Sequence, residues 1–302
     1  MMTFRALEAF RAIVLTGSVT NAASMLHISQ PAVTRLIRDL EADLQFPLFH
    51  RRKGRLFATS EGLALFEEVS RSFVGLDRIA QVANHIRQSR VGHLQLATMP
   101  ALINGFLPRV VNQFNIERPE VFVSMQVNRT QTVAGMVASQ QCDLGFVALP
   151  AKAPGIDLVR QYHAQCVCIL PPDHALTALH SITAADLEDQ PFVALSQGTL
   201  TRLKVDAVLQ TAAVTPNIKM ETPLSLAAVN LVMEGMGISI IDPFTAIHHS
   251  RLGGAVRPFL PTVAFEYGVI FNDHAPASGL KQAFLQTFEA LLKQYTEEHF
   301  CH

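Results

Sequence analysis

The chain has 302 residues, 49% of them hydrophobic, which is enough for two or three domains with substantial cores. Residues 1–14 form a charged amphipathic pattern, and no apolar run is long enough to span a membrane, so we expect a cytoplasmic protein with no membrane partner. The net charge of −1 conceals an asymmetry, because residues 1–90 hold 12 Lys/Arg and 8 Asp/Glu whereas the remainder holds 12 and 17. A basic end on an acidic body is typical of a protein that contacts nucleic acid at one end.

The first three predicted elements are helices. Residues 4–15 carry apolar side chains at helical spacing and predict a helix that packs against the next two. Within 18–41, Ser18 is a favourable N-cap for one short helix, and Ser29 caps a second that has Pro31 in its first turn. The tight joint between them predicts a helix-turn-helix.

The helix that begins after Ser29 has an apolar back and a polar front. A capped helix with Gln, Thr and Arg on its exposed face is suited to the DNA major groove. An amphipathic surface helix without a DNA contact is the alternative interpretation. The predicted DNA contacts on this helix are Ser29, Gln30, Pro31, Thr34, Arg35 and Arg38.

A basic hairpin is predicted next, over residues 46–59. Two short apolar runs flank the sequence Arg51-Arg52-Lys53-Gly54, so the positive charge lies at the tip. Such a wing beside a helix-turn-helix can reach phosphates or the minor groove. We therefore predict that Arg51, Arg52 and Lys53 contact the DNA backbone.

These features together resemble the LysR-type transcriptional regulators. The residues that carry the resemblance are Ala22-Ala23, Leu26, Ser29-Gln30-Pro31-Ala32, Thr34, Ile37, Leu40-Glu41, Leu48-Phe49, Arg51, Thr59 and Gly62. It implies a winged helix-turn-helix, a long linker helix and a two-lobed, periplasmic-binding-protein-like (type 2) effector domain, an α plus α/β architecture. The corresponding domains are 1–59, 60–90 and 91–302.

Residues 60–90 contain no proline and have apolar residues every three or four positions, which predicts one long helix. So long a stripe has little of its own chain to pack on, which favours pairing with a second copy. We assign Phe66, Phe73 and Leu76 to that self-interface. A connector lying on its own domain is the alternative.

From residue 91 the pattern changes to alternating strands and helices, which predicts largely parallel sheets in two lobes. Predicted strands are 93–98, 121–127, 143–149, 166–170, 192–195, 218–221, 238–241 and 264–271. Predicted helices are 102–116, interrupted or started by Pro108, and 131–140, 199–211, 224–234 and 276–299. The resemblance places lobe I at about 91–162 and 266–302, and lobe II at about 163–265.

The sequence offers no catalytic motif: it has no Gly-x-Ser-x-Gly elbow, phosphate loop or dinucleotide fingerprint, so we expect no enzyme activity and no cofactor. The histidines at 248–249 and 299–302 lack partners at metal-ligand spacing, and no metal site is expected. The four cysteines fit no zinc pattern and are expected to be buried thiols, although a pair brought together by the fold stays open.

The resemblance alone places the effector contacts. It implies Thr98, Met99, Pro100, Ala101, Thr130, Gln131, Phe146, Ser196, Gly198, Thr199 and Asp242. The runs 99–109 and 237–243 further resemble regulators of octopine and nopaline catabolism, which suggests an amino-acid-like effector. Asp242 before Pro243 is a preferred helix start, so its carboxylate is either a cap alone or a cap that also binds a ligand cation.

The predicted function is that of a ligand-responsive transcription activator. We expect a homodimer or homotetramer that binds an interrupted inverted repeat in double-stranded DNA, senses a small-molecule effector between its lobes and contacts RNA polymerase. A two-lobed small-molecule-binding protein without DNA-dependent regulation, and a ligand-independent DNA-binding repressor, are the alternatives.

Overall fold

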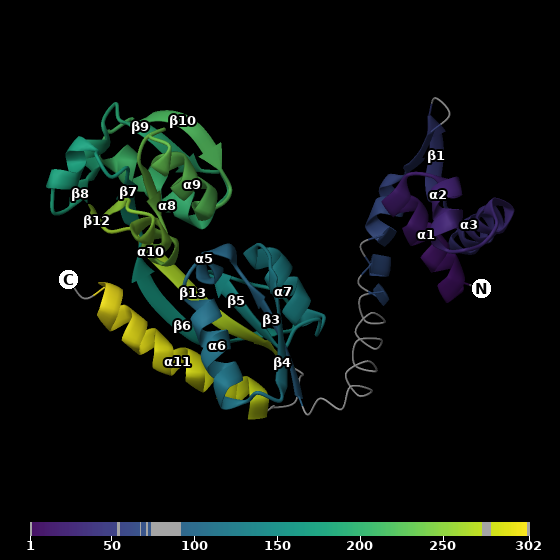
Figure 1. Ribbon diagram of the computed structural model, residues 1–302. Coiled ribbons are helices and arrows are strands. Elements are labelled where there is room, and N and C mark those ends of the chain that lie inside the picture. The colour runs from purple at the N-terminus through teal and green to yellow at the C-terminus, as the bar shows by residue number, and fades with distance from the viewer. Residues whose placement is uncertain are drawn as a thin grey trace. The chain divides into compact units, whose positions relative to one another are not determined.

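The computed structural model describes residues 2–52, 55–66, 68–70, 72–73, 92–273 and 279–300. The chain divides into two compact units, residues 1–87 and 88–302, whose elements are shown in Figure 1. Within the described residues, every helix is too short or too polar to cross a membrane.

The N-terminal unit is a helix-turn-helix followed by a hairpin. Its elements are α1 (Phe4–Thr16), α2 (Val19–Met25), α3 (Gln30–Leu44), β1 (Phe49–Arg52), β2 (Arg55–Ala58) and a helical stretch over 60–66. The hydroxyls of Ser18 and Ser29 accept hydrogen bonds from the backbone N–H groups of Asn21 and Ala32. Both predicted N-caps are therefore confirmed, as is the antiparallel wing.

Two polar contacts fix the wing to this unit. Glu41 Oε1 accepts from the backbone N–H groups of Leu48 (2.7 Å) and Phe49 (3.2 Å), which joins the end of α3 to β1. The Thr59 hydroxyl accepts from Gly62 N–H at 2.9 Å, and a Cβ on Gly62 would collide with the Leu48 carbonyl oxygen. Glycine is required there because two backbones approach closely.

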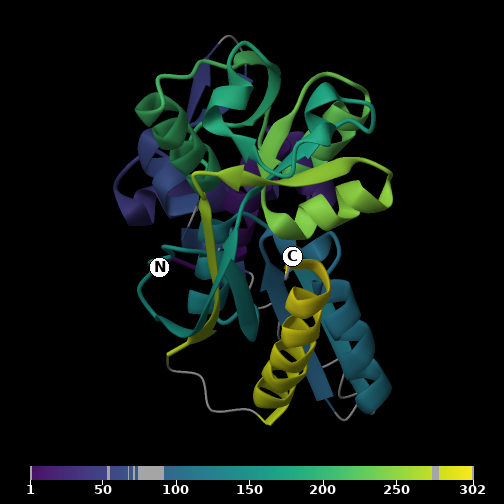
Figure 2. The same ribbon diagram turned by 90° about the vertical axis from the view of Figure 1, so that its left-hand side faces the viewer.

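Lobe I of the C-terminal unit is a five-stranded sheet in the order β4-β3-β5-β13-β6. Its strands are β3 (Gly92–Thr98), β4 (Val121–Val127), β5 (Leu144–Ala148), β6 (Ile156–Gln165) and β13 (Ala264–Asn272). Its helices are α5 (Pro100–Ile103), α6 (Leu107–Glu117), α7 (Thr130–Ala138) and α11 (Gly279–Phe300). Figure 2 shows α11 beside α6, and the two cover one face of the sheet while α7 packs on the other.

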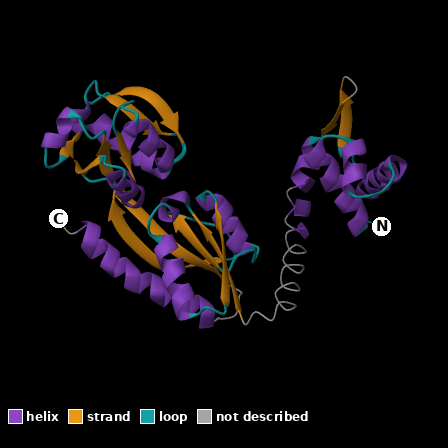
Figure 3. Ribbon diagram, in the orientation of Figure 1, coloured by secondary structure: helices purple, strands orange, loops and turns teal. Residues whose placement is uncertain are grey.

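Lobe II contains a four-stranded sheet in the order β11-β7-β12-β8 and the parallel pair β9–β10. Its strands are β7 (Val167–Leu170), β8 (Ile182–Thr183), β9 (Pro191–Leu195), β10 (Asn217–Thr222), β11 (Ser239–Ile241) and β12 (Ala255–Leu260). Its helices are η1 (Ala175–Ala178), η2 (Ala184–Leu187), α8 (Leu200–Thr211), α9 (Ser225–Met233) and α10 (Pro243–Arg251). Figure 3 shows that both lobes contain helices and strands.

Two expectations for this unit were wrong, whereas the helix expected over 102–116 is divided into α5 and α6, in agreement with the predicted interruption or start at Pro108. Three strands, β6, β8 and β12, were not predicted. Strand β6 has no apolar run, β8 has only two residues, and β12 contains Pro258, which argues against a strand. The sheets are mixed rather than largely parallel, because β13 runs antiparallel to both β5 and β6.

Lobe II encloses one histidine that bears on its stability. His249 on α10 is 0% exposed, its Nε2 lies 2.8 Å from the Leu170 carbonyl oxygen, and its Nδ1 has no hydrogen-bond partner. A Cβ on Gly254 would overlap the imidazole, so backbone packs directly on the ring. Burial lowers the pKa of His249, because the charged imidazolium would be desolvated.

We expect this histidine to make the fold acid-sensitive. Its folded pKa is below its unfolded value of ~6.5, so the stability it confers is complete above that pH and is lost as the pH falls below it, at up to ~1.4 kcal/mol per pH unit. The free energy of unfolding in urea should fall less between pH 7.5 and pH 5.5 for His249→Gln than for the parent. An equal fall in both proteins would mean that His249 does not contribute to the acid sensitivity.

Candidate DNA-binding and effector-binding sites

The exposed face of α3 is the candidate DNA-binding surface. Of its six predicted contacts, Ser29 is the N-cap, and the other five line one hollow of ≈540 Å³: Gln30, Pro31, Thr34, Arg35 and Arg38. The apolar back of the helix is buried by Val33, Ile37 and Leu40. The structure therefore gathers the polar front that the sequence predicted and turns it to solvent.

The two arginines on this face share one carboxylate. Arg35 Nε is 3.7 Å from Asp39 Oδ2, and Arg38 Nη2 is 3.4 Å from Asp39 Oδ1. Both guanidinium-bearing side chains stay at least 75% exposed. Exposed pairs of this kind are weak, so Asp39 orients the arginines without removing them from DNA.

The wing and the linker are described in part. Arg51 and Arg52 pair in register with Leu56 and Arg55, but the side chains of these two arginines, and all of Lys53, lie outside the described residues. Their phosphate contacts stay a prediction.

Two of the three residues assigned to the self-interface, Phe66 and Phe73, pack within their own unit. Phe73 is 7% exposed, with its ring 4.5 Å from that of Phe4, and Phe66 meets Phe10 edge-on at 6.4 Å. Leu76 lies outside the described residues. The packing of Phe73 agrees with the alternative of a connector lying on its own domain, and the self-interface stays a prediction.

In lobe I, the predicted effector residues gather at the carboxyl ends of β3 and β5. Met99 N–H donates to the Phe146 carbonyl at 2.9 Å, and the Thr130 hydroxyl accepts from Ala148 N–H at 3.1 Å. The chain thus turns into α5 and α7 at one edge, where α/β sheets bind ligands. Of the others, Thr98 is fully buried, Pro100 and Ala101 are half-buried, and Gln131 is exposed.

In lobe II, the predicted residues form the turn from β9 into α8. The Thr199 hydroxyl caps α8 by accepting from Arg202 N–H at 3.2 Å and donates to the Ser196 carbonyl at 3.0 Å. Gly198 in this turn has φ +88°, which a residue with a side chain adopts only with strain. The turn is half-exposed, so its backbone is available to a ligand.

Besides Thr98 and Met99, two further residues assigned to the cleft are buried. Phe146 is 0% exposed and packs on Phe288 of α11 at 5.0 Å, so it belongs to the core of lobe I. Asp242 is 2% exposed and caps α10, accepting from Thr245 N–H at 2.8 Å. Burial raises the pKa of Asp242, and the hydrogen bonds from Thr245 and the Ser225 hydroxyl partly oppose that rise. Because Asp242 is only 2% exposed, its carboxylate presents no open surface to a ligand cation.

A contact between the lobes was not foreseen. Phe244 in the first turn of α10 is 0% exposed and packs on Tyr267 at 5.3 Å and on Phe106 at 5.9 Å, both from lobe I. Beside it, Asn104 Nδ2 donates to the Thr245 hydroxyl at 3.3 Å. The only sequence signal for this contact was Phe244 itself, an aromatic residue in the first turn of a helix, a position that a polar residue could also occupy.

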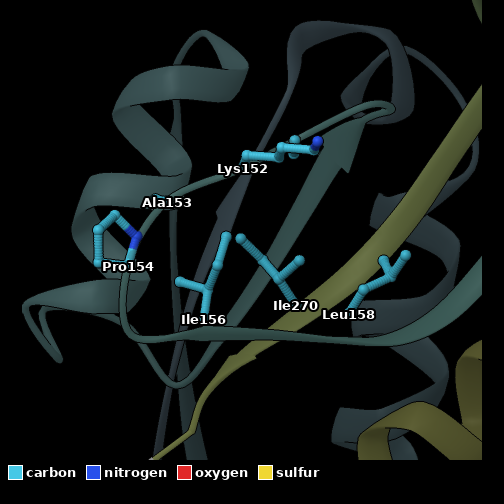
Figure 4. Close-up of a pocket in the computed structure, with 7 residues that line it drawn as sticks. Lys152, Ala153, Pro154, Ile156, Leu158 and Ile270 are labelled. Atoms are coloured by element: carbon cyan, nitrogen blue, oxygen red, sulfur yellow. The ribbon is translucent and has the colours of Figure 1, made fainter.

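A hollow of ≈370 Å³ lies at the edge of lobe I (Figure 4). It is lined by Ala151, Lys152, Ala153, Pro154, Ile156, Leu158 and Ile270. None of the predicted effector residues lines it, so it is separate from the strand ends where they gather.

The cysteines in the described part of the chain are free thiols. Cys142, Cys166 and Cys168 are all buried, and burial raises the pKa of the Cys166 thiol to about 12. A thiol with so high a pKa is unreactive at neutral pH. Cys301 lies outside the described residues.

Comparison with known protein families follows this division of the chain. Residues 4–63 match the bacterial regulatory helix-turn-helix protein of the lysR family, and residues 87–293 match the LysR substrate binding domain. The chain is a LysR-type transcriptional regulator. The predicted architecture and family are confirmed.

Individual relatives span nearly the whole regulator. Regulatory protein NocR of Agrobacterium fabrum is 38% identical over 295 residues, covering 96% of this chain and 98% of NocR. The octopine catabolism/uptake operon regulatory protein OccR of Rhizobium meliloti is 37% identical over 258 residues, 85% of each chain. The predicted likeness to opine regulators is thereby confirmed. Full-length CbnR in complex with its target DNA shares the fold, with a TM-score of 0.75 at 23% identity over 96% of this chain and 100% of CbnR.

We expect Asp242 to act through its cap geometry rather than its charge. Asp242→Asn keeps an oxygen that can accept from Thr245 N–H, so its free energy of unfolding should stay near that of the parent. Asp242→Ala leaves that N–H unsatisfied and should cost ~1–2 kcal/mol in urea unfolding. An Asn variant as unstable as the Ala variant would show that the buried charge itself is needed.

Proposed function

We propose that this regulator binds an interrupted inverted repeat in double-stranded DNA as a homodimer or homotetramer, and that a small metabolite held between the lobes makes it an activator. The observation that carries the proposal is the exposed front of α3, where Gln30, Thr34, Arg35 and Arg38 share one hollow above a fully apolar back. No cofactor beyond the effector is assigned, and RNA polymerase is the proposed further partner.

An amino-acid-like effector is supported by the relatives rather than by a charged pocket. OccR is described as regulating octopine catabolism and uptake, and the opine regulators match most of the chain. Asp242 no longer supplies a residue-level reason, because its carboxylate is buried. In lobe II the half-exposed turn from Ser196 to Thr199 is the part of the predicted site that a ligand can reach.

The DNA contact can be tested without knowing the operator. Duplexes selected from a random pool by the parent protein supply a binding site, and affinity is then measured across a salt titration. Arg35→Ala should weaken binding by ~1–3 kcal/mol and relax sequence preference if it loses a base contact. Arg5→Ala, which removes the same charge from an exposed position on α1, is the control.

Parent-like affinity of both Arg35→Ala and Gln30→Ala would remove α3 as the base-contacting helix. Failure of the parent to enrich any duplex would favour a two-lobed binding protein without DNA-dependent regulation. DNA binding and transcription that ignore every metabolite would instead favour a ligand-independent repressor.

Assembly through the C-terminal unit is supported by exposed apolar side chains on an edge strand and a helix in each lobe. On α6 and β4 these are Ile116 (66% exposed), Phe122 (39%) and Val127 (44%). On α8 and β10 they are Leu203 (67%), Ile218 (44%) and Met220 (45%). A single exposed leucine is ordinary, but several exposed large apolar side chains on the edge elements of each lobe favour an interface there.

The double variant Ile116→Glu, Leu203→Glu places one charge among these exposed side chains in each lobe. Each charge would be desolvated in an interface, so the dissociation constant of the assembly, measured by sedimentation velocity, should rise at least ~10-fold. Leu252→Glu, at the exposed end of α10, is the matched control. A double variant that sediments like the parent would place the assembly surface elsewhere.

A further inference from the structure

Lys204 on α8 makes two contacts with the first residues of β13. Its Nζ donates to the Ala264 carbonyl at 2.9 Å and lies 3.2 Å from Glu266 Oε2. The other carboxylate oxygen of Glu266 is 3.7 Å from His163 Nδ1 on β6. Both side chains of the Lys204–Glu266 pair are about one-third exposed, at 32% and 34%, so water can reach the pair.

These contacts cross the junction between the lobes. The Glu266 carbonyl accepts from Leu149 N–H at 2.9 Å, which puts Glu266 in the sheet of lobe I. Three residues earlier, the Val263 carbonyl accepts from Cys166 N–H at 2.8 Å, at the start of lobe II. Lys204 belongs to a lobe II helix, so the pair spans the short segment where the chain passes from one lobe to the other.

We propose that Lys204 and Glu266 form a hinge brace, an ion pair that holds α8 against β13 and limits bending between the lobes. The contact at Phe244 is of a different kind, because Phe244 is fully buried among lobe I aromatic rings, with the Asn104–Thr245 hydrogen bond beside it. Separating Phe244 would expose apolar surface, whereas parting Lys204 from Glu266 exchanges one polar partner for water. The hinge brace is therefore the contact that yields first when the lobes rotate.

The position of the hinge brace also connects it to the proposed effector site, and this step rests on the proposed function. Lys204 lies in the second turn of α8, and Thr199 caps the same helix. A ligand that displaces the turn from Ser196 to Thr199 moves α8 as a rigid body, and Lys204 moves with it. Occupancy of the turn thus changes the distance between Lys204 and Glu266.

Interlobe distances measured by electron–electron double resonance on the full chain test the hinge brace without a ligand. Nitroxide labels at Ser139→Cys on lobe I and Glu234→Cys on lobe II report the lobe angle, since both sites are exposed. The native Cys142, Cys166 and Cys168 are buried and resist labelling, and Cys301 is replaced by serine.

We expect a narrow distance distribution for the parent and for Lys204→Arg, which keeps the charge. Lys204→Met and Glu266→Gln should each give a broader distribution with a longer mean, at a melting temperature near that of the parent. Arg160→Met is the matched control, because Arg160 Nε pairs with Glu289 Oε1 at 2.7 Å entirely within lobe I.

Distributions of Lys204→Met and Glu266→Gln that superimpose on the parent would overturn the hinge brace, as would an equal broadening in Arg160→Met. These outcomes do not depend on DNA binding or on an effector. A protein with a confirmed hinge brace that binds no operator would leave the inference intact and refute the proposed function.

Discussion

Pairing between β6 and β13 is the interaction on which the C-terminal unit depends. The two strands are antiparallel neighbours from Ala264 opposite Gln165 to Asn272 opposite Ile156, with one bulge near Val269. The chain leaves lobe I through β6 and returns through β13, so only Cys166 and the residues 261–263 separate this ladder from the strands of lobe II. Because both connections are this short, the lobes can rotate about the end of one ladder but cannot separate.

Local chemistry explains why the N-terminal unit could be predicted from the sequence almost residue by residue. Its helices begin at Ser18 and Ser29, where a side-chain oxygen satisfies an N–H group that the helix cannot. Its wing follows from two apolar runs around a basic tip. Each of these signals acts within a few residues, so no knowledge of the tertiary structure was needed.

The C-terminal unit was predicted less completely because its decisive contacts are distant in sequence. Strand β6 is stabilised by β13, more than a hundred residues later, and its own pattern of half-exposed residues has no apolar period. Pro258 in β12 argued against a strand that long-range pairing nevertheless forms. Burial also determines which predicted site residues a ligand can reach. Asp242 was correctly predicted as an N-cap, but its carboxylate is buried because the neighbouring Phe244 packs between the lobes.

The predicted self-interface shows the same limit of periodicity. A stripe of apolar residues at helical spacing states that one face of a helix is covered, but not by what. Phe73 satisfies that requirement within its own unit, where Phe4 stacks on it and the Arg11 guanidinium lies 5.2 Å from its ring centre. Exposure, rather than period, distinguishes the faces still available for assembly, and on the C-terminal unit these lie at the edge strands β4 and β10.

The Phe244 contact and the Lys204–Glu266 pair contribute different amounts of free energy to the association of the lobes. Burial of a phenylalanine contributes about 1.5–3 kcal/mol, whereas an ion pair as exposed as Lys204–Glu266 contributes about 0–1 kcal/mol. A ligand of micromolar affinity binds with about 8 kcal/mol, and only the fraction that distinguishes two lobe angles can shift their populations. This part of the binding free energy can exceed the ~0–1 kcal/mol of the ion pair without separating Phe244 from lobe I. Under the proposed function, the lobes rotate while the Phe244 contact stays in place, and the Lys204–Glu266 pair sets how little ligand free energy the rotation requires.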